Sequence, residues 1–240
     1  MSTRPNAIVV AGPGTNRDRD LVLALELAGA DAAVVLTTEL QQHPELLAEA
    51  QLLAVAGGFS YGDALGAGRM LALDLTAGEQ ALHEFVATGK PVIGICNGFQ
   101  ALTRAGVLPG ALGHNAHGTF ECRWVQIDPE PTSTCVWIGD LTQPVHCPIA
   151  HGEGRYVHPD PHGLAAAGQV ALRYRSTNPN GSVADIAGVS NAAGNVLGLM
   201  PHPENFVVAR QHPQHTTGGD HSDHLGLQLF RNGVAAAREC

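Results

Sequence analysis

Short apolar runs recur along the first half of the chain, with segments of helical spacing between them. The runs are rich in alanine, valine, isoleucine and leucine and occupy residues 7–11, 32–36, 52–56 and 92–95. Runs of this length and composition are typical of buried strands. Their alternation with helices predicts a parallel sheet joined by right-handed crossovers.

The segments between these runs carry helix start and stop signals. The first predicted helix ends at Gly29, and a short helix is expected after Pro44. Thr76 and Glu79 have the spacing of a capping box, which predicts a helix that begins at Thr76 and ends at Gly89.

After Gly106 the pattern changes to one typical of antiparallel strands. Apolar and polar residues alternate over residues 119–127, and short β-rich runs follow at residues 134–138, 170–174, 182–189 and 195–200. We therefore predict an α/β fold with an open, mostly parallel twisted sheet flanked by helices and an added antiparallel strand section. One domain is expected to span residues 1–240.

Composition and charge narrow the classes of function. The chain has 240 residues, is 44% hydrophobic and carries a formal net charge of −9, which disfavours nucleic acid or an anionic membrane as a partner. Its single lysine, Lys90, lies outside any P-loop pattern. Five cysteines without a Cys-x-x-Cys pair, and no signal peptide or apolar segment of membrane-spanning length, indicate a cytoplasmic protein.

Cys96 lies where a predicted strand meets a predicted helix. Gly94 and Gly98 flank it symmetrically, and the helix is expected over residues 98–105. This Gly-x-Cys-x-Gly spacing resembles a nucleophile elbow, in which a tight turn lifts the central side chain out of the backbone. The helix N-terminus favours a thiolate there. The alternative is a core cysteine at the end of a strand.

A glycine-rich segment follows the third predicted strand. Residues 57–68 contain five glycines at the expected carboxyl edge of the sheet, where open α/β sheets bind their ligands. Backbone N–H groups in such a loop can stabilise a developing negative charge. The alternative is a flexible connector.

His202 and Glu204 follow the last predicted strand, and Pro201 and Pro203 lie on either side of the histidine. Proline disfavours helical backbone at the residue before it, so we expect an extended segment in which both side chains point the same way. A carboxylate beside histidine fixes its tautomer and stabilises the imidazolium, as the base of a nucleophile requires. A histidine without a catalytic role is the alternative.

The last part of the chain is polar and rich in histidine, over residues 209–224. Metal binding is conceivable, but the irregular spacing favours a solvated surface loop, and no metal site is predicted. A closing helix is expected from Ser222 or Asp223.

Several of these stretches resemble a known family. Gly-Ile-Cys96-Asn-Gly-Phe-Gln100 and Pro-His202-Pro-Glu204 resemble the triad of class I glutamine amidotransferases, which have a flavodoxin-like fold. Further stretches resemble the glutaminase subunit of phosphoribosylformylglycinamidine synthase, at residues 57–63, 120–124, 151–155 and 178–182. The similarity extends from Ile8 to about Phe206.

The resemblance implies a role for each matching residue. Cys96 would be the nucleophile, His202 the base and acid, and Glu204 the carboxylate that orients His202. The groups that would face the substrate are the backbone N–H groups of Gly58 and Asn97, as an oxyanion hole, and the side chain of Gln100.

The resemblance also implies a reaction and partners. Glutamine would be hydrolysed to glutamate and ammonia through a cysteine thioester. The ammonia would pass to a synthetase subunit that makes phosphoribosylformylglycinamidine in de novo purine biosynthesis, with a small third subunit bridging the two. ATP and magnesium are expected on the synthetase, and no cofactor on this chain. The isolated chain is expected to have low glutaminase activity.

The sequence departs from the family pattern at three places, which are Arg17, Gly66 and Asn205. Other interpretations are a glutaminase for another ATP-dependent synthetase, a stand-alone cysteine hydrolase, or a non-catalytic subunit of the same fold. A dinucleotide-binding module is disfavoured because Gly12-Pro-Gly14 lacks the Gly-x-Gly-x-x-Gly spacing.

Overall fold

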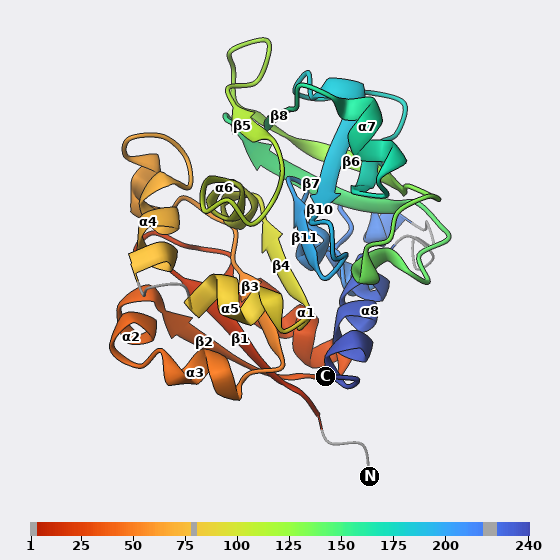
Figure 1. Ribbon diagram of the computed structural model, residues 1–240. Coiled ribbons are helices and arrows are strands. Elements are labelled where there is room, and N and C mark those ends of the chain that lie inside the picture. Colours follow the sequence, from red (N-terminus) through yellow and green to blue (C-terminus); the bar gives the residue numbers. More distant parts are fainter. Residues whose placement is uncertain (1–3, 78–80, 218–224) are drawn as a thin grey trace.

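The computed structural model describes residues 4–77, 81–217 and 225–240. Within these residues the main sheet has nine strands in the order β2-β1-β3-β4-β11-β10-β9-β6-β7 (Figure 1). Its first five strands pair in parallel. These are β2 (Asp31–Leu36), β1 (Asn6–Ala11), β3 (Leu52–Val55), β4 (Val92–Ile95) and β11 (Val196–Leu199).

Helices cover both faces of the parallel part, so its central strands are apolar on both sides. Every residue of β3, β4 and β11 is buried. On one face α1 (Asp18–Ala28) packs against α8 (Leu227–Ala237). The other face carries α2 (Thr37–Gln42), α3 (Glu45–Glu49), α4 (Arg69–Ala77), α5 (Ala81–Ala87) and α6 (Asn97–Arg104) (Figure 1).

The remaining four strands extend the sheet with antiparallel pairing. They are β10 (Ile186–Ser190), β9 (Val170–Tyr174), β6 (Glu121–Pro129) and the edge strand β7 (Val145–His151). Buried and half-buried residues alternate along β7, as expected for a strand with one face in the core. A second, two-stranded sheet pairs β5 (Ala111–Gly113) with β8 (Arg155–Val157), and α7 (Pro161–Ala166) follows.

The predicted parallel sheet and its antiparallel extension are confirmed, but several local predictions are wrong. Thr76 does not begin a helix, because it lies inside α4 and its hydroxyl donates to the carbonyl of Ala72. Glu79 and the predicted helix start at residues 222–223 lie outside the described residues. The closing helix α8 begins at Leu227.

Two predicted strands are wholly or partly replaced by 3₁₀ turns. Val136–Ile138 is a 3₁₀ turn, in which Trp137 is fully buried and donates its indole N–H to the carbonyl of Asn195 at 3.2 Å. Val183–Asp185 is another 3₁₀ turn, so strand β10 begins only at Ile186. In the first case the burial of a large aromatic side chain overrode β propensity, which depends strongly on context.

The helix that follows Cys96 packs unusually close to the sheet. A Cβ placed on Gly98 would lie 2.0 Å from the carbonyl oxygen of Val55, and one on Gly94 would lie 2.8 Å from the Gly98 backbone. Only glycine at both positions allows this approach. The spacing of the two glycines therefore holds the start of α6 against the ends of β3 and β4.

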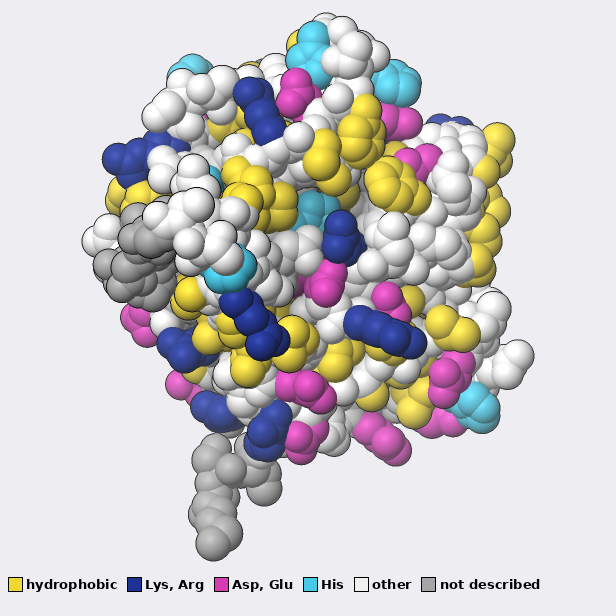
Figure 2. All heavy atoms as spheres, turned by 180° about the vertical axis from the view of Figure 1, so that it is seen from behind, with side chains coloured by type: hydrophobic (Ala, Val, Ile, Leu, Met, Phe, Trp, Pro, Cys, Tyr) yellow, Lys and Arg dark blue, Asp and Glu magenta, His cyan; other side chains and the backbone are white. Residues whose placement is uncertain are grey.

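The surface seen from behind shows hydrophobic side chains in small groups among charged ones (Figure 2). Leu23 and Leu27 of α1 are partly exposed, at 37% and 44%. Across the described ranges, no helix is both long and apolar enough to cross a bilayer.

Replacing Gly98 with alanine should destabilise the fold by about 3 kcal/mol, because the added methyl group collides with backbone atoms of β3 that cannot rotate away. Urea denaturation of the purified chain measures this change. Gly113→Ala is the matched control, since a Cβ there meets no atom within 4 Å. Its effect should stay within about 0.5 kcal/mol. Equal stability of the two variants would contradict the close approach of α6 to the sheet.

Candidate active site

Cys96 occupies a strained turn between β4 and α6. Its φ is 50° and its ψ is −102°, a conformation that residues other than glycine rarely adopt. Hydrogen bonds hold the backbone on both sides: the Cys96 N–H donates to the carbonyl of Leu199 at 2.7 Å, and the Gln100 N–H donates to the Cys96 carbonyl at 3.0 Å. The predicted elbow is therefore present, and its strain is of the kind that clusters at functional sites.

His202 and Glu204 form a buried pair next to this turn. Nδ1 of His202 lies 2.6 Å from Oε1 of Glu204, and the two side chains are 4% and 0% exposed. The His202 N–H donates to the carbonyl of Pro148 in β7 at 2.9 Å. The predicted contact is present, but the predicted extended backbone is wrong. Glu204 lies in a 3₁₀ turn, Pro203–Asn205, that brings its carboxylate to the imidazole.

The charges around His202 favour its imidazolium form. Burial disfavours the charge, but the carboxylate of Glu204 and the sulfur of Cys96 outweigh this effect and raise the pKa of His202 to about 10. The contribution of the Cys96 sulfur to this raised pKa shows that it lies close to the imidazole, and Sγ itself lies 3.9 Å from the carbonyl oxygen of Ala150. With Nδ1 facing Glu204, Nε2 of His202 is the ring nitrogen left for the chemistry.

The glycine-rich segment lies directly against His202. A Cβ placed on Gly57 would lie 2.8 Å from Cε1 of the imidazole. Gly58 has a φ of 133°, and a Cβ there would lie 2.6 Å from the backbone nitrogen of Asn16. Neither position has room for a side chain. Gly57 thus lies against the imidazole, and Gly58, whose N–H is a predicted oxyanion donor, is the next residue along the chain.

Asn97 and Gln100 join the elbow to two neighbouring loops. The Asn97 carboxamide accepts from the N–H and hydroxyl groups of Ser60, and its Nδ2 donates to Asp63 and to Gln100. Nε2 of Gln100 donates to the carbonyl of Glu153 at 2.7 Å. Asn97 is also the first residue of α6, and the backbone N–H groups of a first helical turn have no partner within the helix. Its N–H is thus suited to donate to an oxyanion, while the Gln100 side chain already has partners at both ends.

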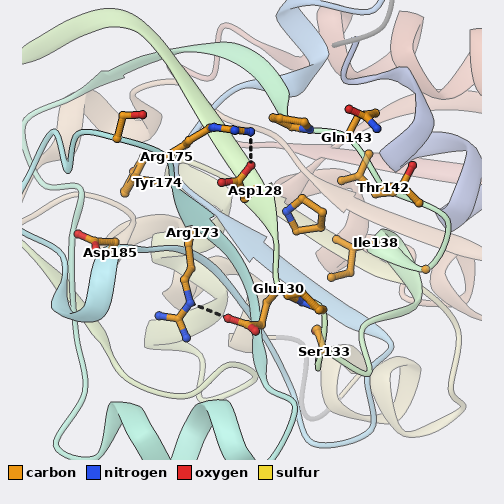
Figure 3. A pocket seen from close by; sticks show the side chains of 16 residues that line it. Asp128, Glu130, Ser133, Ile138, Thr142, Gln143, Arg173, Tyr174, Arg175 and Asp185 are labelled. Carbon is orange, nitrogen blue, oxygen red and sulfur yellow. Dashed lines mark hydrogen bonds and ion pairs between the residues drawn. The ribbon is translucent and has the colours of Figure 1, made fainter.

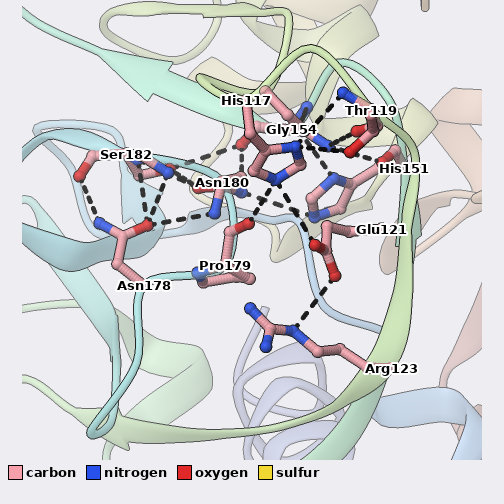
Figure 4. Close-up of polar contacts among 12 residues, drawn as sticks. His117, Thr119, Glu121, Arg123, His151, Gly154, Asn178, Pro179, Asn180 and Ser182 are labelled. Carbon is pink, nitrogen blue, oxygen red and sulfur yellow. Dashed lines mark hydrogen bonds and ion pairs between the residues drawn. The ribbon is translucent and has the colours of Figure 1, made fainter.

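A buried polar network adjoins the site, and the sequence indicated no role for its members. Nδ1 of His151 lies 3.1 Å from Oδ1 of Asn115, and Asn180 donates to the Gly154 carbonyl at 2.8 Å (Figure 4). Burial, together with the nearby charge of His202, lowers the pKa of His151 to about 4. The family resemblance covers 151–155 and 178–182, so it located these loops without explaining them. Their hydrogen bonds hold the Glu153 carbonyl that accepts from Gln100.

The histidine-rich segment is more than a solvated loop. His212 is 2% exposed, and its ring packs against Trp124, His146 and Phe206 at centroid distances of 5.0 to 5.3 Å. The prediction of a wholly solvated loop is therefore wrong at His212, because two of these neighbours, Trp124 and His146, are supplied by distant parts of the chain. His221 and His224 lie outside the described residues. In the described part of the chain, no group of three or more His, Cys, Asp or Glu side chains is arranged to hold a metal ion.

A cavity of about 910 Å³ lies away from Cys96, at the far ends of β6 and β9 (Figure 3). Four of its charged side chains form two ion pairs: Arg173 with Glu130 at 2.6 Å, and Arg175 with Asp128 at 3.1 Å. The residues that line it include none of the predicted site residues. The residues predicted to react therefore lie at the elbow and not in this cavity.

The structure brings together two of the three departures from the family pattern. Arg17 and Asn205 both contact the carboxylate of Asp20, at 3.1 and 2.8 Å. Gly66, the third, has a φ of 109°, which favours glycine, and a Cβ there would lie 3.4 Å from the guanidinium of Arg104.

A family model, two curated relatives and one solved structure are consistent with one another. The model of the CobB/CobQ-like glutamine amidotransferase domain matches residues 4–235. Phosphoribosylformylglycinamidine synthase subunit PurQ of Treponema denticola is 45% identical over 87% of this chain and 90% of its own length. PurQ of Dehalococcoides mccartyi is 39% identical over 99% of both chains. A chain in the structure of PurLQS from Thermotoga maritima superimposes with a TM-score of 0.80 at 38% identity, covering 97% of this chain and 98% of that chain.

The raised pKa of His202 predicts how its imidazole titrates. The ring should stay protonated through pH 8, and Glu204→Gln should lower its pKa by several units, because burial then outweighs the remaining favourable contacts. NMR titration of the imidazole resonances, assigned with His202→Asn, measures this. Because the folded pKa exceeds that of an unfolded histidine, the charge stabilises the fold fully below about pH 6.5. That stabilisation declines as the pH rises toward 10.

His151 provides the internal control for this titration. It is also buried, but without a carboxylate partner its pKa is about 4, so it should stay neutral from pH 5.5 to 8. In Glu204→Gln its pKa should rise slightly, because the neutral His202 no longer disfavours a second charge. A His202 resonance that titrates near pH 6.5 in both the unmodified chain and the variant would contradict the charged pair.

Proposed function

The chain belongs to the CobB/CobQ-like glutamine amidotransferase family, and we propose that it is the glutaminase subunit of phosphoribosylformylglycinamidine synthase. The PurQ relatives, matched over nearly their whole length, support this assignment within the family. The observation that carries the chemistry is the strained Cys96 elbow beside the buried His202–Glu204 pair, whose imidazole has a pKa that the sulfur helps to raise.

The reaction begins with attack of the Cys96 sulfur on the side-chain carboxamide carbon of glutamine. As the C–S bond forms, negative charge develops on the carboxamide oxygen. The backbone N–H groups of Gly58 and Asn97 are the proposed donors to this oxyanion. Asn97 is well placed because it follows the nucleophile directly and begins α6.

His202 then acts as a general acid. Its imidazolium donates a proton to the departing nitrogen, the C–N bond breaks, and ammonia leaves a γ-glutamyl thioester on Cys96. The neutral imidazole next removes a proton from water, which attacks the thioester to release glutamate and restore the thiolate. Glu204 keeps the imidazole oriented and compensates its charge in the first step.

Ammonia released into water would be protonated and lost, so a synthetase must receive it through a sheltered path. The proposed partners are the synthetase subunit and the small bridging subunit of the same enzyme. The Thermotoga maritima neighbour belongs to a structure named PurLQS, which agrees with such an assembly. ATP and magnesium are proposed to bind the synthetase, and this chain is proposed to need no cofactor of its own. Its cytoplasmic location is part of the same proposal and follows from the purine-biosynthetic role.

An exposed aromatic pair beside the site is suited to contact this partner. Phe59 directly follows Gly58 and is 37% exposed, while Phe120 is 54% exposed, and their ring centroids lie 6.2 Å apart. Exposed aromatic residues are enriched in protein interfaces. A subunit seated over them would lie next to the point where ammonia is released.

Labelling with the diazoketone analogue of glutamine, read by peptide mass spectrometry, tests the assignment. We expect one adduct, on Cys96, that glutamine competes away and that His202→Ala slows, because the imidazole stabilises the reactive sulfur. In the complex with the synthetase and bridging subunits, Cys96→Ala should lower glutamine-dependent product formation by at least about 10³-fold while ammonium salts still support it.

The other cysteines provide controls. Cys122→Ser removes an exposed thiol and should retain labelling and activity. Burial raises the pKa of Cys135 to about 11 and that of Cys147 well above its usual value, so neither should be labelled. Labelling of Cys122 as readily as Cys96, or no protection by glutamine even in the complex, would reject the glutaminase in favour of a non-catalytic subunit.

A further inference from the structure

One carboxylate outside the proposed triad joins two segments that border the site. Oδ2 of Asp20, in the first turn of α1, accepts a hydrogen bond from Nδ2 of Asn205 at 2.8 Å and one from Nη1 of Arg17 at 3.1 Å. Asp20 and Asn205 are 185 residues apart in the chain. We call these two contacts the Asp20 bridge.

Each end of the Asp20 bridge is attached to a part of the proposed machinery. The backbone N–H of Arg17 donates to the carbonyl of Gly57 at 3.3 Å, and Thr15 pairs with Gly58. At the other end, Asn205 directly follows Glu204 in the same 3₁₀ turn. The bridge therefore ties the segment that presents the Gly58 N–H to the turn that presents the carboxylate of Glu204.

Between these two ends the backbone is closely packed. Gly57 lies against the imidazole of His202 so closely that a Cβ would be 2.8 Å from Cε1. A Cβ on Gly58 would likewise collide with the backbone of Asn16. A small shift of the residue 15–17 segment relative to residues 202–205 must therefore move Gly57 and Gly58 relative to His202.

We propose that Asp20 is a positioning residue for glutamine hydrolysis, which sets the spacing between the oxyanion N–H of Gly58 and the His202–Glu204 pair. The inference rests on the proposed function. The Asp20 carboxylate is hydrogen bonded to Arg17 and Asn205 and not to the sulfur or the imidazole, so it acts through those two residues. Displacement of a catalytic group by about 1 Å can lower a rate by about a hundredfold, so a residue that only positions such groups can have a large effect on the rate.

The solvent exposure of the bridge separates this role from a structural one. The side chains of Arg17 and Asp20 are 43% and 34% exposed. Ion pairs this exposed contribute little to folding stability. Loss of the bridge should therefore lower turnover much more than it lowers stability, whereas a merely structural contact would change both slightly.

The chain offers a matched control in the bridge between Arg175 and Asp128. The same two atom types lie 3.1 Å apart there, and the side chains are 47% and 42% exposed (Figure 3). This pair borders the cavity at the far end of β6 and has no contact with the proposed site residues.

The experiment compares Asp20→Ala with Asp128→Ala in the assembled complex with the synthetase and bridging subunits. For Asp20→Ala we expect kcat of glutamine hydrolysis to fall by about tenfold, with KM changed less than about threefold and the melting temperature within a few degrees of the unmodified protein. Asp128→Ala should leave kcat and KM unchanged.

Rescue by a donor on the opposite side tests the geometry directly. Arg17→Ala should lower kcat by about three- to tenfold, because the carboxylate keeps only the Asn205 amide. Adding Asn205→Arg supplies a guanidinium from the other segment and should restore kcat to within about twofold of the unmodified complex. In the Asp20→Ala background, Asn205→Arg should restore nothing.

Three outcomes would overturn the proposal. The first is that kcat of Asp20→Ala equals that of the unmodified complex. The second is that Asp128→Ala loses as much kcat as Asp20→Ala. The third is that Asn205→Arg fails to restore kcat in Arg17→Ala. If the unmodified complex releases no ammonia from glutamine, the proposed function fails. The role of Asp20 is then decided by the rate at which iodoacetamide alkylates Cys96 across pH 6 to 9. The proposal predicts a severalfold slower alkylation rate in both Asp20→Ala and Arg17→Ala. Adding Asn205→Arg should restore the rate in the Arg17→Ala variant.

Discussion

The contact between His202 and Glu204 is the interaction on which the rest of the site depends. Both side chains are almost completely buried, and removing either charge from this environment would leave the other without compensation. The pair is stable because the turn at Pro203–Asn205 places the carboxylate 2.6 Å from the ring while β7 fixes the His202 backbone. An imidazole held in its charged form can then protonate a poor leaving group at neutral pH.

Around this pair, glycines shape the site by allowing backbone segments to pack closely together. Gly94 and Gly98 let α6 lie against the sheet, which forces Cys96 into its strained turn. Gly57 and Gly58 leave room for the imidazole and for the strand pairing with Thr15. A larger residue at Gly58, Gly94 or Gly98 would collide with backbone atoms, and one at Gly57 would collide with the His202 imidazole. The reacting groups are therefore positioned before substrate arrives.

The antiparallel half of the sheet contributes contacts to the site. Its edge strand β7 accepts the His202 N–H at Pro148 and places the Ala150 carbonyl 3.9 Å from the Cys96 sulfur. The following loop is held by Asn115 and Asn180 and supplies the Glu153 carbonyl to Gln100. One end of the proposed substrate site therefore depends on residues far from the elbow in sequence.

The sequence by itself determined the parallel strands, the elbow and the pairing of His202 with Glu204, because those features arise from local patterns of apolar residues, glycine and proline. Only the tertiary structure decided that Trp137 lies in a 3₁₀ turn, that His212 is buried, and that Asp20 joins Arg17 to Asn205. Each of those outcomes depends on contacts between segments far apart in the chain, whose energies exceed local propensity. Glycine spacing acts within a few residues and can be recognised directly, whereas the neighbours of a buried side chain exist only after the chain has folded.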